Sequence, residues 1–68
     1  KVLNYILEKS RRLIQEEKLP QELRQELDRL SRDYERAMRG QSEDRDIDDL
    51  EDRLLEMIEE AEEELEAD

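Results

Sequence analysis

The sequence contains no cysteine, histidine or tryptophan, and only one glycine and one proline in 68 residues. Without cysteine the chain forms no disulfide bond and carries no mark of a redox compartment. The usual acid–base and nucleophilic groups are missing, and the serines Ser10, Ser31 and Ser42 have no evident base or oxyanion hole. One glycine is too few for a phosphate-binding loop. The chain is therefore predicted to be neither an enzyme nor a cofactor-binding protein.

Long hydrophobic runs are also missing. The apolar residues come in short groups such as Val2-Leu3 and Ile6-Leu7, far short of the ~20 residues that span a membrane. Nothing has the form of a secretory signal peptide. We therefore expect no membrane span and no secretion, and the cytoplasm is the default location.

Residues typical of strands are scarce, whereas helix-forming Leu, Glu, Arg, Gln and Lys dominate. One break is Lys18-Leu19-Pro20, because the residue before a proline is pushed out of the helical region. Another is Gly40, which follows basic residues as is typical of a helix end. These breaks predict helices over about residues 1–17, 20–39 and 43–66. Ser42 or Asp44 is expected to cap the third helix.

Each predicted helix carries an apolar stripe with helical spacing. The stripes consist of Val2, Leu3, Ile6, Leu7, Leu13 and Ile14, then Leu23, Leu27, Leu30, Tyr34, Ala37 and Met38, then Ile47, Leu50, Leu54, Met57, Ile58, Ala61 and Leu65. Ser10 lies within the first stripe, where a small residue lets a neighbouring helix approach. Short connections favour antiparallel neighbours, so we predict one all-α domain, an antiparallel up-down-up three-helix bundle. A long interrupted coiled coil is the alternative, which Pro20 and the segment after Gly40 disfavour.

The negative charge is concentrated in the last part of the chain. Residues 1–40 hold 10 Lys/Arg and 8 Asp/Glu, whereas residues 41–68 hold 2 and 15. Binding to nucleic acid depends on phosphate neutralisation by basic residues, so nucleic acid and anionic membranes are not expected partners. The acidic run is either a solvated face or a surface that attracts a basic partner.

One acidic pattern partly resembles a metal-binding site. Asp44, Asp46 and Asp48 match the opening of a calcium-binding loop. The sixth position of such a loop should be glycine and the twelfth glutamate, but these are Asp49 and Leu55. We therefore predict no metal site, and expect these acids to compensate the dipole at the start of a helix.

Two apolar residues lie off the stripes. Tyr5 lies about 60° from the first stripe and Leu55 about 100° from the centre of the third. Each is either an edge residue partly covered by a neighbour or part of a contact surface. Together with Leu3, they are the candidates for self-association of the chain.

Three stretches of the chain follow one another in the order and spacing of a known helical unit. Residues 4–17 (NYILEKSRRLIQEE) look like the end of a long helix, and Lys18-Leu19-Pro20 looks like its turn into the next. Ala37-Met38-Arg39-Gly40 looks like the end of that second helix. Over most of its length the chain thus resembles the C-terminal helical lid of the seventy-kilodalton heat-shock chaperones, the DnaK family.

The resemblance implies a mechanical role. In that family the lid closes over a β-sandwich that holds an extended peptide, while ATP in a separate domain drives opening, and the lid performs no chemistry. The family latches the lid with an acidic residue and a histidine one turn later, at positions that look like Asn4 and Glu8 here. Asn4 cannot make a charged latch, and Glu8 has the opposite sign. Asn4, Tyr5, Glu8 and Leu55 are therefore the candidate contacts with the peptide-binding domain or another protein.

An independent or designed three-helix module is the alternative, binding a protein partner through one helix face. The simple Leu/Glu/Arg composition favours design. A helical pattern that starts at Val2 without a cap residue, and Ser10 inside the stripe, favour a piece of a longer protein.

Overall fold

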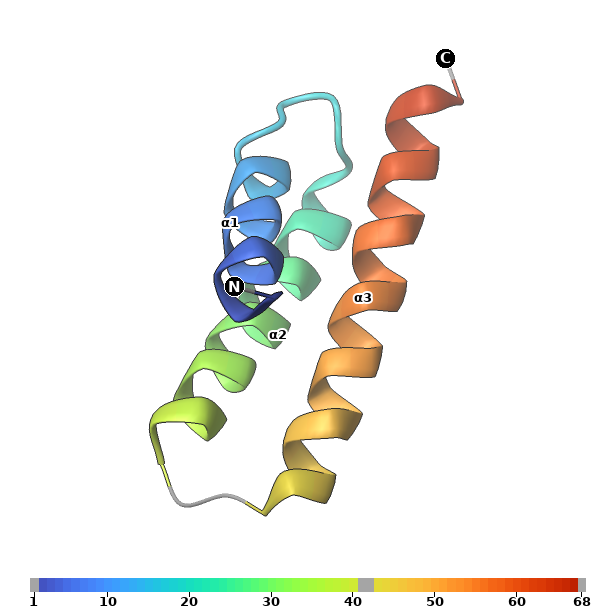
Figure 1. The fold of residues 1–68 in the computed structure, drawn as a ribbon. Coiled ribbons are helices and arrows are strands. Elements are labelled where there is room, and N and C mark those ends of the chain that lie inside the picture. The colour runs from blue at the N-terminus through green and yellow to red at the C-terminus, as the bar shows by residue number, and fades with distance from the viewer. Residues whose placement is uncertain (1, 41–42, 68) are drawn as a thin grey trace.

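The computed structural model describes residues 2–40 and 43–67, with side chains described from Tyr5 onward. Three helices follow one another: α1 (Val2–Ile14), α2 (Gln21–Arg39) and α3 (Asp44–Glu66). They run up, down and up, and α3 extends alongside α2 for the whole length of that helix (Figure 1). The described ranges contain no strand. The predicted all-α, antiparallel up-down-up three-helix bundle is confirmed, as an elongated body of 40 × 19 × 15 Å.

The first helix ends earlier than the predicted boundary near residue 17. α1 stops at Ile14, because the backbone N–H groups of Gln15 and Glu16 bond to carbonyls only three residues back, at 3.2 and 3.0 Å. Such bonds tighten the last turn and satisfy carbonyls that the helix leaves open. The chain then crosses to α2 through an irregular segment that ends at Pro20.

Pro20, predicted to be the first helical residue, occupies the N-cap position, and α2 begins one residue later at Gln21. The Pro20 carbonyl accepts the first helical hydrogen bond, from the N–H of Arg24 at 3.1 Å. Leu19, just before it, is only 2% exposed and belongs to the core. The connection between α1 and α2 is therefore held by an apolar anchor as well as by the proline.

The second connection follows the expected stop at Gly40, whose N–H bonds to the carbonyl of Arg36 at 2.9 Å. The N-cap of α3 differs from the prediction. Glu43 holds that position without a side-chain cap bond, and Asp44 is the first helical residue instead of the cap. Ser42, the other predicted cap, lies outside the described residues. Asp44 and Asp46 in the first turn place negative charge at the positive end of the helix dipole.

The core runs between the three helices and is built mainly from the predicted stripes. Its buried apolar side chains are Ile6, Leu7, Leu13, Leu19, Leu27, Leu30, Tyr34, Leu54, Ile58 and Ala61. Two residues differ from that prediction: Leu19 joins the core from outside the stripes, whereas Met38 of the second stripe is exposed in the last turn of α2. The side chains of Val2 and Leu3 lie outside the described residues.

Ser10 is fully buried among the core side chains and donates its hydroxyl to the carbonyl of Ile6 at 2.9 Å. This bond satisfies the hydroxyl within its own helix, so α1 can approach its neighbours closely at this point. α2 and α3 make the most extensive helix contact, and α1 and α3 the least.

Tyr34 makes the stability of the bundle sensitive to alkaline pH. Burial raises the pKa of its phenol, and the negative charges of Glu51 and Asp48 raise it further. In the unfolded chain this phenol ionises at about pH 10, whereas in the folded protein it stays neutral to higher pH. The free energy of unfolding is therefore expected to fall as pH rises above about 10.

The Tyr34→Phe variant tests this effect, because it keeps the ring and removes the ionisation. Its stability should decline less than that of the unchanged protein between about pH 9 and about pH 11. Urea unfolding at several pH values measures both curves. Parallel curves for the two proteins would contradict the assignment.

Candidate protein-interaction surfaces

One surface lies along the seam between α1 and α3 and centres on Lys9. The Lys9 ammonium donates to the hydroxyl of Tyr5 at 3.1 Å, and its Nζ lies 5.3 Å from the centroid of that ring. The same ammonium pairs with the Glu62 carboxylate of α3 at 2.8 Å. The hydrogen bond to Glu62, followed by that to Tyr5, raises the pKa of Lys9. Tyr5 nevertheless leaves 54% of its surface exposed, so about half of this residue is available for contact.

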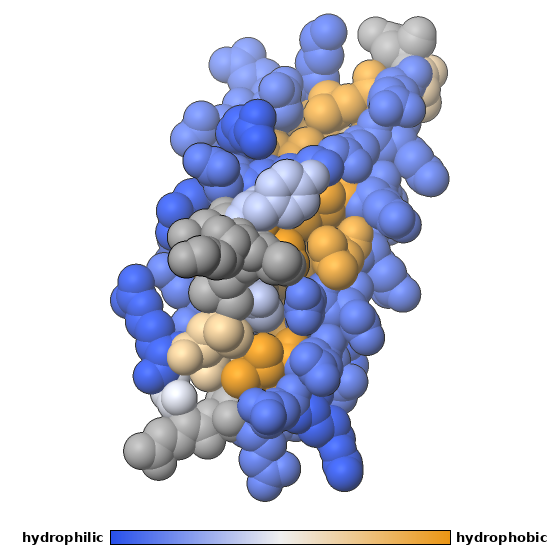
Figure 2. Space-filling view, in the orientation of Figure 1, coloured by the Kyte–Doolittle hydropathy of each residue, from blue (hydrophilic) through white to orange (hydrophobic). Residues whose placement is uncertain are grey.

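Leu55 lies on the same side of the molecule. It precedes Glu62 by seven residues, or about two helical turns, and therefore shares its face of α3. Leu55 is 39% exposed, whereas the adjacent Leu54 is fully buried. Figure 2 shows a face on which apolar surface appears in separate patches between rows of hydrophilic side chains. Of the four sequence-predicted contact residues, Tyr5 thus lies at the α1–α3 seam, and Leu55 lies about two turns from it on the Glu62 face of α3.

The other two predicted contacts do not join this seam. Glu8 is exposed and lines a shallow depression with Leu7, Arg11 and Glu35, which places it on the α2 side of α1. Arg11 and Glu35 link these helices through an ion pair at 3.6 Å. The side chain of Asn4 lies outside the described residues. Glu8 and Tyr5 are thus neighbours about 60° apart around the helix, with Glu8 nearer α2 and Tyr5 nearer α3.

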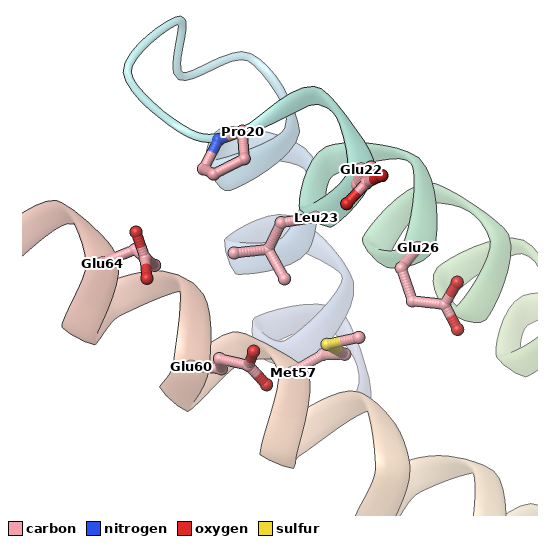
Figure 3. A pocket seen from close by; sticks show the side chains of 7 residues that line it. All are labelled: Pro20, Glu22, Leu23, Glu26, Met57, Glu60 and Glu64. Atoms are coloured by element: carbon pink, nitrogen blue, oxygen red, sulfur yellow. The ribbon is translucent and has the colours of Figure 1, made fainter.

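A further surface, which the sequence did not suggest, is a groove between α2 and α3. We define the α2–α3 groove by its lining residues Pro20, Glu22, Leu23, Glu26, Met57, Glu60 and Glu64. Leu23 and Met57 extend toward each other across it, while the glutamates stand along its two helices (Figure 3). The space has a volume of about 380 Å³. A neighbouring hollow of about 230 Å³ shares Glu26, Met57 and Glu60 and continues toward Leu30, so the depression is elongated along the helices.

The groove is strongly negative at the Pro20 end. Four of its lining residues are glutamates, and none is basic. Glu26 is paired with Arg29 of the same helix. Within the described ranges, Glu22, Glu60 and Glu64 form no ion pair within 4.0 Å. Glu22 lies in the first turn of α2, where the helix dipole partly compensates its charge. In the described part of the chain, all three carboxylates lack a basic side chain within this distance and remain available to one.

The groove could have been found from the sequence only by combining two patterns. Glu22 and Glu26 flank Leu23, and Glu60 and Glu64 follow Met57, each pair being one helical turn apart. Both patterns are visible along the chain. Their meeting across one groove depends on how α2 and α3 are rotated about their axes, which the stripes define only to within a wide arc.

Metal binding and membrane insertion can be assessed for the described part of the chain. The aspartates Asp44, Asp46 and Asp48 lie within helix α3 and do not form a loop. No cluster of three acidic side chains in residues 2–40 and 43–67 is arranged to hold a metal ion. None of the described helices combines the length and the apolar character that crossing a membrane requires.

Only these surfaces bear on the function of the chain, because comparison with known proteins identifies no relative. The sequence matches no protein-family model, no curated protein and no solved structure.

Proposed function

We propose that this bundle is a non-catalytic helical lid of the seventy-kilodalton heat-shock chaperone type, which closes over a peptide-binding domain by contact between domains. The observation that carries the proposal is the corner between α1 and α2. There Leu19 is buried and Pro20 occupies the N-cap of the next helix, in the segment that resembles the turn of that lid. The end of α2 at Arg39, followed by Gly40, supports the same comparison.

The exposed residues of α1 provide the contacts that such a lid needs. Tyr5 offers an aromatic ring and Glu8 an exposed carboxylate, at neighbouring positions about 60° apart around this helix. Asn4, from the sequence, adds a neutral hydrogen-bonding group. With Glu8 in place of a histidine, the opposing domain must offer a basic or hydrogen-bond-donating group to this position. A lid with this chemistry slows peptide escape by covering the bound peptide, without a covalent step.

A linked-domain experiment tests the proposal. The chain is joined through a flexible Gly/Ser linker to a lidless peptide-binding domain of this chaperone family, which gives an effective concentration in the millimolar range. Release of a fluorescent peptide should slow by about tenfold, and the double variant Tyr5→Ala/Glu8→Lys should recover most of the lidless rate. Glu59→Lys on the exposed face of α3 is the control and should leave the slowing intact. Equal release with and without the linked chain would refute the proposal.

The second candidate function is that of an independent module that binds a protein through one helix face. The α2–α3 groove favours it, because the groove combines an apolar floor with three carboxylates that lack a basic partner among the described residues. Self-association is less favoured than binding to a different protein. Two copies meeting near Leu55 would bring together two acidic α3 helices in a chain of net charge −11.

A further inference from the structure

We propose that the α2–α3 groove binds a basic amphipathic helix of a partner protein. One apolar side chain of that helix inserts between Leu23 and Met57, and its lysines or arginines meet the glutamates on both sides. This inference goes beyond the lid function, since it concerns the face formed by α2 and α3 and none of the α1 residues assigned to lid contact.

The floor of the groove supplies the apolar part of the interaction. Leu23 and Met57 are partly buried, with their inner atoms packed on the core and their outer atoms lining the groove. Pro20 closes one end. Met57 is a flexible, polarizable side chain that adapts to different apolar partners. Removing this exposed apolar surface from water favours binding of an apolar side chain.

The walls of the groove supply the charge. Glu22 and Glu26 stand one turn apart on α2, and Glu60 and Glu64 stand one turn apart on α3 (Figure 3). Residues one turn apart on a helix are separated by about 6 Å along its axis. A helix lying in the groove with basic residues four apart on one flank therefore matches the spacing of Glu60 and Glu64. A basic residue on its other flank meets Glu22, since Glu26 is already paired with Arg29.

The charge pattern selects the partner. Nucleic acid and acidic peptides are repelled by the glutamates, and a second copy of this chain brings its own charge of −11. Arg29 and Arg53 line only the hollow beyond the groove, on the side away from Pro20. A helix with an apolar stripe flanked by lysine or arginine is the class of partner that complements both the apolar floor and the acidic walls of the groove.

The test uses a synthetic helix of about 18 residues with one leucine stripe flanked by lysines, labelled for fluorescence anisotropy. The groove variant is Glu22→Gln/Glu60→Gln/Glu64→Gln, which preserves side-chain size and helix propensity while removing three charges. Each exposed ion pair contributes little, so losing three should weaken binding by about tenfold. The Met57 methyl resonance should shift on binding to the unchanged protein.

A matched variant separates groove binding from general attraction to α3. Glu59→Gln/Glu63→Gln/Glu66→Gln removes the same number of charges from exposed positions outside the groove lining. At physiological salt the Debye length is about 8 Å, so this variant should bind within about twofold of the unchanged protein. Equal weakening by both variants, or an unshifted Met57 methyl, would overturn the proposal. So would failure of the lysine helix to bind, or equal binding of a helix that keeps the lysines but replaces leucine by glutamine. None of these results bears on the lid experiment, whose test variant changes Tyr5 and Glu8 and which measures peptide release.

Discussion

Replacing Leu54 by alanine is expected to leave a large part of the protein unfolded at room temperature. Leu54 is fully buried at the centre of the core, where it packs with residues of the other helices. A buried leucine-to-alanine change costs about 2–5 kcal/mol, because apolar burial is lost and a cavity remains. A core in a chain this small, without disulfides or metals, rarely provides more than about 3–5 kcal/mol of net stability. The expected loss is therefore comparable to the whole free energy of unfolding.

The neighbouring Leu55 provides a matched control. Leu55→Ala makes the same chemical change in the same helix, but its side chain is 39% exposed. The helix-propensity difference is common to both variants, so it cancels in the comparison. Leu55→Ala should alter the free energy of unfolding by less than about 1 kcal/mol. Urea unfolding followed by circular dichroism measures both, and equal losses would contradict the observed rotation of α3.

Replacing Leu19 by alanine is expected to destabilise the bundle by about 2–4 kcal/mol, although this residue lies in a connection between helices. Leu19 is only 2% exposed and packs into the core at the end where α1 passes to α2. Its N–H also bonds to the carbonyl of Glu16 at 3.2 Å, which holds the backbone of the turn. Truncation of the side chain leaves this bond intact and removes only the apolar anchor.

Lys18→Ala is the control for Leu19, since Lys18 is exposed in the same turn. A surface change of this kind usually stays within about 0.5 kcal/mol. Thermal and urea unfolding of the two variants should therefore differ clearly. Equal stability of the Leu19→Ala and Lys18→Ala variants would mean that the turn joins the two helices without adding packing energy to the core.

The helices and their order were predictable because their signals are local. Pro20 restricts the backbone before it and Gly40 follows a basic last turn, so the two breaks depend on neighbouring residues alone. The apolar stripes determine which face of each helix is buried. Ser10 was recognised as a close-approach position on the same basis, and it is fully buried. Short connections then leave few arrangements other than an up-down-up bundle.

The functional surfaces depended on tertiary structure, because they combine residues from different helices. Leu19 marked a turn in the sequence, but only packing of α1 against α2 makes it a core residue. Tyr5 and Glu8 lie about 60° apart around α1, and the rotation of this helix places Tyr5 nearer α3, through Lys9, and Glu8 nearer α2. The α2–α3 groove brings together glutamates more than thirty positions apart along the chain. Local spacing defines the face of a helix, whereas the rotation and approach of neighbouring helices decide which residues meet across that face.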